Sequence, residues 1–268
     1  MLRGFYTAAS GMIAQQRSQE ALSNNIANMN TPGYKADQAA KRAFPELLIQ
    51  QMSSKQIPAS NGSNITSKKT IGSLNTGVYV QEMIPNFSQG DIRETSIKTD
   101  LAIVPGNVPD EDGALFFTVQ NEDGEVRYTR NGNFTVDGQG FLVTGQGYYV
   151  LDDAGNPIET DGMEFIVDPD GTLQTADGQT IELGISYTDN VLDMVKEGND
   201  LFNGEAAAVP EGTTFTVKQG FLEGSNVDAM QTMTDMMTAY RLFETNQRVL
   251  KAYDESMGKA VNDIGKLG

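Results

Sequence analysis

The stretch NNIANMNTPGYKAD, residues 24–37, decides how the N-terminal part of the chain folds. It places asparagines at 24, 25 and 28 in a helical pattern, followed by Thr31-Pro32-Gly33. Proline lacks the amide hydrogen of the helical ladder and biases the residue before it away from helical angles, so the helix must end here. Amides on a helical face can fix the register of helix packing by hydrogen bonding. We therefore predict a helix over residues 3–30 that packs against another helix.

A second and longer helix is predicted over residues 226–267, with Ser225 or Asn226 as its N-terminal cap. Reading by sevens gives one register of Met236, Phe243, Leu250, Met257 and Ile264. The companion register is Thr232, Ala239, Asn246, Tyr253, Ala260 and Leu267. Heptad spacing is typical of helices that pack in a coiled coil. We call these two registers the heptad seam, and we expect the terminal helices to pack on each other or on other molecules.

The middle of the chain is predicted to be an all-β sandwich or barrel. Turn sequences such as NEDG, VDGQG, DDAGN and DPDG recur between short segments of alternating apolar and polar residues. Glycine, asparagine and aspartate tolerate the positive φ angles that hairpin turns require. Turn signals spaced by about ten residues favour a sandwich or barrel. A short helix is expected near residues 191–196.

These patterns predict an α+β chain in four parts. Residues 1–52 are a helix and an extended arm with a helical turn or two at 44–52, residues 77–222 are the β-rich domain, and residues 223–268 are the C-terminal amphipathic helix. Between them, residues 53–76 are rich in Ser, Asn, Thr, Gly and Lys, a composition typical of flexible segments. That segment is either a passive linker or a strap that becomes ordered against a partner.

Composition argues against several classes of protein. The chain has no cysteine and no histidine, so disulfides, thiolate nucleophiles and imidazole bases are excluded. Residues 1–76 carry eight basic and three acidic side chains, whereas residues 77–220 carry six basic and 26 acidic ones. Such an acidic middle disfavours nucleic acid and anionic membranes as partners. No apolar run has the length of a membrane span or of a signal peptide's apolar region.

Catalytic and metal-binding motifs are not convincing. Asp168 and Asp170 resemble the start of a calcium loop, but Thr172 and Gln179 stand where an EF-hand needs an acidic or amide side chain and a glutamate. Carboxylate pairs are too common in this chain to single out a hydrolase site. We therefore expect no enzymatic activity, no cofactor, no metal and no small-molecule substrate.

Several segments resemble those of flagellar rod, hook and hook–basal body proteins, and most closely the rod type. The likeness begins at GFYTAASGMIAQQ and LSNNIANMNTPGYKAD, and continues at QGDIRETSIKTDLAI, RNGNFTVDGQGFLVTGQGYYVLD and EGNDLF. It ends with QGFLEGSNVDAM and the helix that follows it. One departure is VPGNVPDEDGALFF at residues 104–117, where the family usually has a compact glycine-rich turn.

The resemblance implies a structural subunit of the flagellar basal-body rod, which polymerises through its terminal helices into a hollow structure that transmits torque and encloses the export channel. Its partners would be copies of itself, other flagellar axial proteins and the flagellar export apparatus, which would export it without a cleaved signal peptide. The alternative is a secreted β-domain adhesin or enzyme with a closed coiled-coil oligomer. The subunit-interface residues implied by the family motifs are Asn24, Asn25, Asn28, Thr31, Gly33, Tyr34, Leu222, Glu223, Ser225, Asn226 and Val227. The heptad seam adds Met236, Phe243, Asn246, Leu250, Tyr253, Met257 and Ile264.

Overall fold

The computed structural model describes the backbone of residues 2–56, 64–110, 112–160, 162–198 and 200–265. The chain divides into two compact units. The helical unit comprises Met1–Leu22, Ala39–Met83 and Thr234–Gly268, and the β unit comprises Ser23–Gln38 and Ile84–Met233. Each terminal helix therefore contributes residues to both units.

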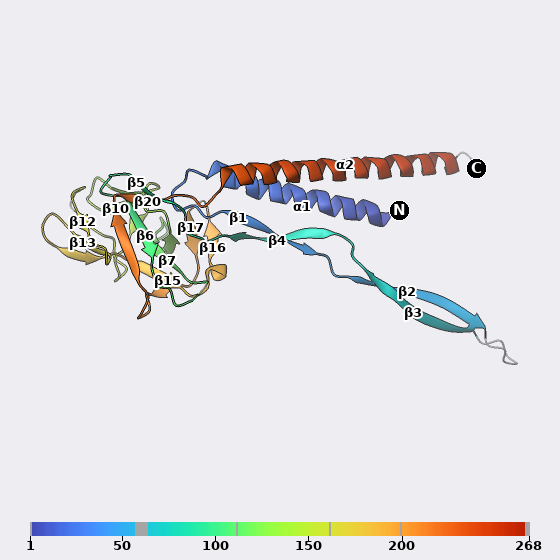
Figure 1. The fold of residues 1–268 in the computed structure, drawn as a ribbon, viewed down its shortest axis with the longest axis horizontal. Coiled ribbons are helices and arrows are strands. Elements are labelled where there is room, and N and C mark those ends of the chain that lie inside the picture. Colours follow the sequence, from blue (N-terminus) through green and yellow to red (C-terminus); the bar gives the residue numbers. More distant parts are fainter. Residues whose placement is uncertain (1, 57–63, 111, 161, 199, 266–268) are drawn as a thin grey trace. The chain divides into compact units, whose positions relative to one another are not determined.

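Among the described residues, the β unit is built around a nine-stranded antiparallel sheet (Figure 1). Its main path runs β16 (Val195–Glu197), β17 (Leu201–Asn203), β8 (Val126–Thr129), β7 (Ala114–Gln120), β11 (Tyr149–Val150), β10 (Leu142–Thr144) and β9 (Phe134–Val136). Off this path, β15 (Ile185–Thr188) pairs with β7 and with β18 (Ala207–Ala208).

Strand β7 is buried on both faces and organises the sheet. Phe117 lies opposite Thr129 of β8 and also opposite Ile185 of β15. Its side chain belongs to the main hydrophobic core together with those of Leu115 and Val119. The alternate residue Phe116 belongs to a second cluster with Met194 and Phe202. The largely apolar sequence of β7 follows from this, because a strand with two buried faces has no exposed face for polar residues. Its one internal polar side chain, Thr118, is hydrogen-bonded to Ser186.

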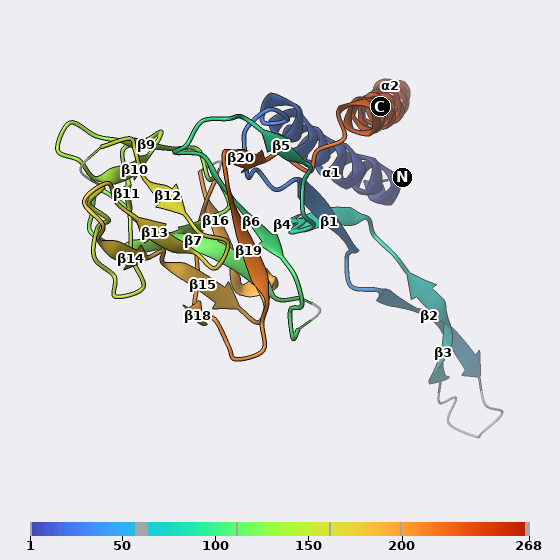
Figure 2. The same ribbon diagram turned by 60° about the vertical axis from the view of Figure 1, so that its left-hand side comes forward.

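Shorter strand groups complete the β unit (Figure 2). They are the three-stranded sheet β12 (Ile166–Val167), β13 (Thr172–Gln174) and β14 (Thr180–Glu182), and the pairs β6 (Leu101–Pro105) with β19 (Phe215–Gln219) and β5 (Ile92–Glu94) with β20 (Phe221–Glu223). The DPDG sequence makes the turn before β13, where Gly171 has a φ of 94°. A 3₁₀ helix at Val191–Asp193 matches the short helix expected there. The prediction of a strand-rich middle region is confirmed.

The helical unit contains the larger parts of α1 (Leu2–Ala27) and α2 (Ala229–Gly265), together with β2 (Leu47–Gln56), β3 (Asn64–Leu74) and most of β1 (Asp37–Ala43) and β4 (Val78–Pro85). Strands β2 and β3 pair antiparallel from Leu47 opposite Leu74 to Gln56 opposite Asn64. The helical turns expected at 44–52 are therefore wrong, because β2 covers most of that stretch. Paired strands also occupy much of the expected flexible segment 53–76, whose residues 57–63 lie outside the described part.

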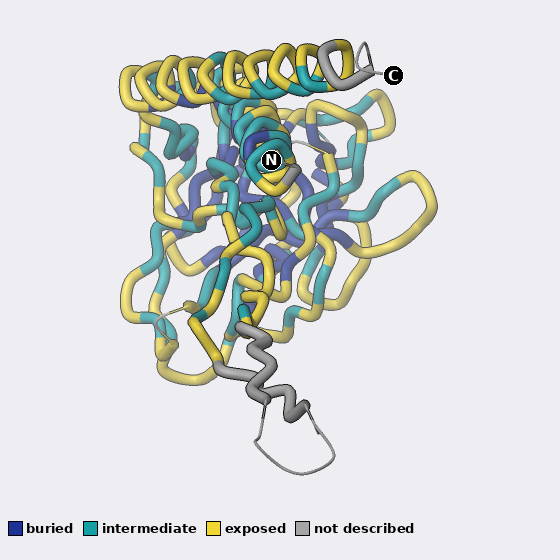
Figure 3. Tube along the Cα trace, turned by 90° about the vertical axis from the view of Figure 1, so that its right-hand side faces the viewer, coloured by how far each residue is buried: buried dark blue, intermediate teal, exposed yellow. Residues whose placement is uncertain are grey.

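The two helices bury different kinds of residue. In α1 the buried positions include Ala8, Ala14 and Ser18, whereas Tyr6 and Ile13 are exposed. In α2 the less exposed positions follow the heptad seam, with Ala239 buried. Figure 3 shows that α2 is largely exposed or half-buried along its length. The small residues of α1, rather than its large apolar ones, make the buried stripe.

The N-terminal cap of α2 is Asp228, and not Ser225 or Asn226 as the sequence suggested. The Oδ1 atom of Asp228 accepts the backbone amides of Met230 at 2.9 Å and Gln231 at 3.0 Å. An aspartate in this position satisfies amides that have no partner inside the helix. Asn226 is used elsewhere, in the contacts described below.

Replacing Phe117 by alanine should lower the free energy of unfolding of the β unit by about 3–5 kcal/mol, because the variant leaves a cavity in a fully buried strand. Urea unfolding followed by tyrosine fluorescence measures this change. Val126 is 44% exposed in the neighbouring strand, so Val126→Ala is the matched control and should have a far smaller effect. Equal destabilisation by the two variants would contradict the central place of β7.

Candidate functional site at the meeting of the two terminal segments

The segment that follows α1 lies against the segment that precedes α2, within the β unit. The amide of Gly33 donates to the carbonyl of Glu223 at 2.8 Å, and the amide of Ala36 donates to Oδ1 of Asn226 at 2.8 Å. The Nδ2 atom of Asn226 donates to the carbonyl of Asn86 at 2.7 Å. We call residues 33–37 and 222–226, with the side chains that hold them, the terminal junction.

The asparagines at the end of α1 hold the turn that follows the helix. Asn25 donates from Nδ2 to the carbonyl of Asp37 at 2.9 Å, and its Oδ1 accepts the amide of Asp37 at 2.8 Å. Asn28 donates to the carbonyl of Asn24 at 3.0 Å, and its Oδ1 accepts the hydroxyl of Thr31 at 3.2 Å. These amides satisfy backbone groups where the helix stops, as Asn side chains commonly do in turns. Their bonds therefore lie within the chain.

Gly33 allows the turn to approach the β unit closely. Its φ is +68°, a left-handed conformation that other residues adopt only at a cost. A Cβ atom at this position would overlap the backbone of Arg130 and Asn131. Glycine is thus required both by conformation and by space.

A buried carboxylate joins the two terminal segments to the sheet. Glu223 is 1% exposed, and its Oε1 lies 2.6 Å from Nζ of Lys35 while its Oε2 lies 2.6 Å from Nη2 of Arg130. The amide of Gly90 also donates to Oε1 at 3.1 Å. Lys35 has a further acceptor in the carbonyl of Ser88 at 2.8 Å, and Arg130 has one in the carbonyl of Leu115 at 2.8 Å. Each charged group of this cluster is therefore hydrogen-bonded on more than one side.

The environment shifts the ionisation of the cluster. Burial lowers the pKa of Lys35 to about 8, Arg130 adds to this, and Glu223 opposes it. For Glu223, burial favours a higher pKa, but the positive charges of Arg130 and Lys35 outweigh it and hold the pKa below its ordinary value. At neutral pH Lys35 and Glu223 are consequently both charged.

Tyr34 and Lys196 form the other side of the terminal junction. Tyr34 is fully buried, and its hydroxyl donates to Oδ1 of Asn25 at 3.1 Å. The Nζ atom of Lys196 lies 3.8 Å from the centre of the Tyr34 ring and donates to Oδ2 of Asp37 at 3.1 Å. Burial, together with the charge of Asp37, raises the pKa of the Tyr34 hydroxyl, which therefore stays protonated and remains a donor. A lysine over an aromatic face adds a cation–π attraction.

The arrangement is a clamp. Its donors and acceptors are consumed by one another, and within the described residues no group of three or more acidic, histidine or cysteine side chains could hold a metal ion. Across that same part of the chain, neither helix is long and apolar enough to cross a membrane. What the geometry can do is fix the end of α1 and the start of α2 to the β unit.

The structure brings together many of the residues expected at a subunit interface. Asn25, Asn28, Gly33, Tyr34 and Glu223 are buried in the terminal junction, and Asn226 is half-buried. Five other expected residues lie close to these in the sequence. Asn24 is exposed, and the half-buried ones are Thr31, Leu222, Ser225 and Val227. Leu222 pairs in β20 opposite Arg93.

Sequence reasoning missed Lys35, Asp37, Arg130 and Lys196. The first two lie inside the stretch quoted at the outset, and Arg130 opens the RNGNF motif. Lys196 directly precedes EGNDLF. Their positions beside family-like motifs were the available signal, but nothing local indicates which acidic group each cation meets.

Most of the heptad seam lies in the helical unit, whereas Thr232 lies in the β unit. The seam faces α1 at two of its positions. A Cβ atom on Gly11 would lie 3.1 Å from Nδ2 of Asn246, and one on Gly4 would overlap the ring of Tyr253. The seam residues Met236, Phe243, Leu250 and Met257 are half-buried. The side chain of Ile264 and the whole of Leu267 lie outside the described part of the chain.

Comparison with protein-family models gives three matches. Residues 5–35 match a model described as "Flagella basal body rod protein", residues 112–163 match "Flagellar hook protein FlgE/F/G D1 domain", and residues 218–263 match "Flagellar basal body rod FlgEFG protein C-terminal". The first match contains residues 33–35 of the terminal junction, and the third contains residues 222–226.

Full-length relatives agree with these matches. The chain is 43% identical over 279 residues to the flagellar hook-basal body complex protein FlhO of Bacillus subtilis, covering 100% of both chains. It is 33% identical to the flagellar basal-body rod protein FlgG of Agrobacterium fabrum, covering 95% of this chain and 96% of that protein. It is also 30% identical to FlgF of Caulobacter vibrioides over 100% of both chains.

Replacing Glu223 by glutamine should lower the free energy of unfolding of the β unit by about 3–5 kcal/mol, because two buried cations lose their counter-charge. The control is Glu164→Gln, which removes an ion pair to Lys98 at 3.9 Å whose side chains are 62% and 87% exposed. Exposed pairs contribute little, so this control should be nearly silent. Urea unfolding at neutral pH compares the two, and a silent Glu223→Gln would contradict the clamp.

The effect of Glu223→Gln should also depend on pH. The folded chain holds the pKa of Glu223 below the ordinary value of 4.5, so its contribution to stability is present above about pH 4.5 and is lost as the pH falls through the folded-state pKa. The difference in unfolding free energy between the parent and the variant should therefore be largest near neutral pH and shrink in acid. Unfolding curves between about pH 7 and 3 test this, and a constant difference would show that the carboxylate charge is not responsible.

Proposed function

This chain belongs to the family of flagellar basal-body rod and hook–basal body proteins. We propose that it is a structural subunit of the bacterial rod and that it assembles as follows. The family is a structural one and not a class of enzymes. In our proposal the subunit polymerises through its terminal helices into a hollow axial structure. That structure transmits torque and encloses the export channel, and the β unit forms its outer layer.

The observation that carries this proposal is the apolar surface on the helices. Tyr6 and Ile13 of α1 are 64% and 57% exposed, and Tyr240 and Val261 of α2 are 60% and 71% exposed. Large apolar side chains gathered on exposed helices indicate a surface that other protein covers. The heptad seam supplies a further row of half-buried side chains, for which we propose coiled-coil-like pairing with α1 and with neighbouring copies.

The interface residues divide into two groups in this proposal. Those of the heptad seam contact other helices directly. Those of the terminal junction act from within each chain, because they set how the polypeptide leaves and re-enters the β unit. In this proposal, residues 1–52 and 223–268 form the contacts of assembly, whereas residues 77–222 face outward. These are three of the four parts predicted from the sequence.

The proposal also includes partners and location. We infer contacts with copies of this chain and with other flagellar axial proteins, and passage through the flagellar export apparatus to a place outside the cytoplasm. We propose that this export takes place without cleavage of a signal peptide. A heterologous contact that repeats along an axis produces a filament, whereas a closed contact produces an oligomer of one mass.

Replacing Met257 by glutamate tests the role of the heptad seam. Met257 is a half-buried seam position, and an unpaired charge inside a helix interface costs several kcal/mol. Rod formation and motility should be lost in cells that carry the variant, while the thermal melting of the β unit in the purified protein stays unchanged.

The control is Met257→Leu, which keeps an apolar side chain of similar volume and should support motility. Normal swimming of the glutamate variant would contradict the proposal. So would a purified parent protein that forms a closed oligomer of one defined mass, as expected for the alternative of a secreted adhesin or enzyme.

A further inference from the structure

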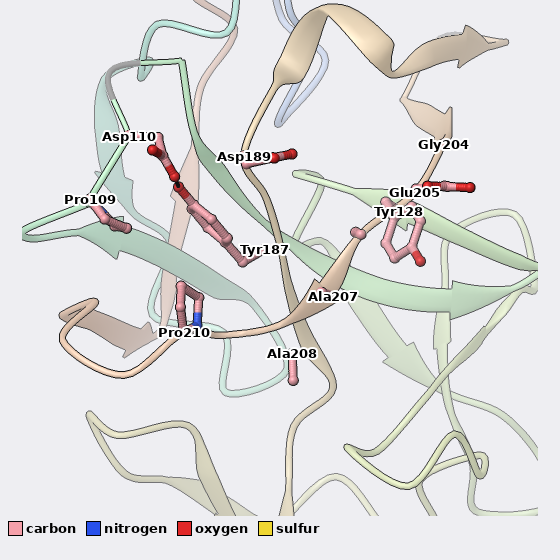
Figure 4. A pocket seen from close by; sticks show the side chains of 11 residues that line it. Pro109, Asp110, Tyr128, Tyr187, Asp189, Gly204, Glu205, Ala207, Ala208 and Pro210 are labelled. Atoms are coloured by element: carbon pink, nitrogen blue, oxygen red, sulfur yellow. Dashed lines mark hydrogen bonds between the residues drawn. The ribbon is translucent and has the colours of Figure 1, made fainter.

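The β unit contains an open cavity of about 880 Å³ (Figure 4), and none of its lining residues lies within 33–37 or 222–226. Four segments wall it: the loop after β6, strand β8, the end of β15, and the stretch leading through β18. Among the described residues its lining consists of Pro109, Asp110, Tyr128, Tyr187, Asp189, Gly204, Glu205, Ala206, Ala207, Ala208 and Pro210. Most of these residues lie outside the ranges that the family models match, so the cavity is a feature that those models do not describe.

The loop that walls the cavity is held in place by the rest of the β unit. The hydroxyl of Tyr187 donates to Oδ2 of Asp110 at 2.8 Å. The amide of Asn107 donates to the hydroxyl of Thr214 at 2.7 Å. Gly113 lies against the Tyr187 ring, which a Cβ atom at that position would overlap. This loop is part of the stretch 104–117 that departs from the family pattern, and its position builds one wall of a preformed cavity.

The lining combines apolar surface with negative charge. Two tyrosine rings, two prolines and three alanines supply the apolar surface, while Asp110, Asp189 and Glu205 supply carboxylates. Among the described lining residues none is basic. The pKa of Tyr187 is raised to about 12, first by burial and then by its contact with Asp110, with Asp189 adding to the effect. The cavity therefore favours a cation that also has a flat or apolar part.

We propose that this cavity binds the side chain of an arginine presented by another polypeptide. A guanidinium group stacks on aromatic rings and pairs with carboxylates through two parallel hydrogen bonds. Tyrosine and carboxylate groups from four segments line one hollow, which supplies both kinds of contact. Charge complementarity favours such a partner, because residues 77–220 carry 26 acidic and six basic side chains. The proposal goes beyond assembly through the helices, since no lining residue belongs to α1 or α2.

The test uses the purified full-length chain and Nα-acetyl-arginine amide as the probe. Its binding should shift the amide NMR signals of Ala206, Ala207 and Ala208, with a dissociation constant in the millimolar range expected of a single side chain. Nα-acetyl-citrulline amide has nearly the same shape without the charge, and it should bind at least about fivefold more weakly. Equal binding of the two probes, or no shift at the lining residues, would overturn the proposal.

Two matched double variants separate the cavity from the overall charge of the unit. Asp189→Asn with Glu205→Gln removes two exposed carboxylates from the lining and should weaken arginine amide binding at least about fivefold. Asp177→Asn with Glu182→Gln removes two exposed carboxylates at β14, away from the lining, and should leave binding unchanged. Equal weakening by both would indicate a general electrostatic effect and overturn the site. Failure here leaves the rod proposal intact, because that proposal is tested at Met257.

Discussion

The buried carboxylate of Glu223 is the constraint on which the β unit depends. Glu223 is almost fully excluded from water, and an ionised group in that position is tolerated only when opposite charges and hydrogen-bond donors surround it. Lys35 supplies one charge from the segment after α1, and Arg130 supplies the other from the residue that follows β8. Arg130 also donates to carbonyls in β6 and β7. The residue that pairs with Glu223 is therefore hydrogen-bonded to β7 at the centre of the sheet.

The value of such a cluster lies in selecting one arrangement more than in raw stability. Removing charges from water is costly, and well-packed apolar residues can be equally stable in their place. An apolar contact, however, tolerates a shift of the chain by one residue, whereas moving Lys35 away from Glu223 leaves the buried ammonium group without its counter-charge. Gly33 has a left-handed backbone conformation that the residues next to it in the sequence would adopt only at a cost. A shift of the chain is therefore opposed by the backbone as well. Together they define a single register for the terminal junction.

The elements that could be predicted from the sequence are those whose signal is local and periodic. The heptad seam follows from a spacing of seven, and the less exposed positions of α2 keep that spacing. The turn at DPDG follows from glycine's tolerance of positive φ, and the end of α1 follows from Pro32. In each case the residues that carry the signal are close together in the chain, so no knowledge of distant contacts is needed.

Other features depended on contacts that sequence patterns do not contain. The family motifs marked Glu223 as important, but its partners Lys35 and Arg130 are ordinary charged residues until the chain folds. The amides at 24, 25 and 28 were expected between helices. Within this chain Asn25 bonds to Asp37 of the following turn, and Asn28 bonds to Asn24 and Thr31, which the helical pattern alone does not indicate. The paired strands β2 and β3 were missed because a composition rich in polar residues does not indicate which two segments will pair as strands.

Lys35 and Glu223 are separated by 188 positions in the sequence, and this distance has a consequence for how the molecule is made. The conformational entropy lost on closing a long loop rises only slowly with its length, by about 0.6 kcal/mol for each doubling. The separation therefore affects when the Lys35–Glu223 pair can form more than how stable the folded chain is. Polypeptides are synthesised from the N-terminus, and Lys35 therefore exists for most of that process with its ammonium group in water. A nascent chain that has not yet reached residue 223 can form the local turn around Gly33 but not the clamp. The clamp can therefore form only in a chain that has been translated past residue 223, because only then can the segment after α1 be joined to the segment before α2.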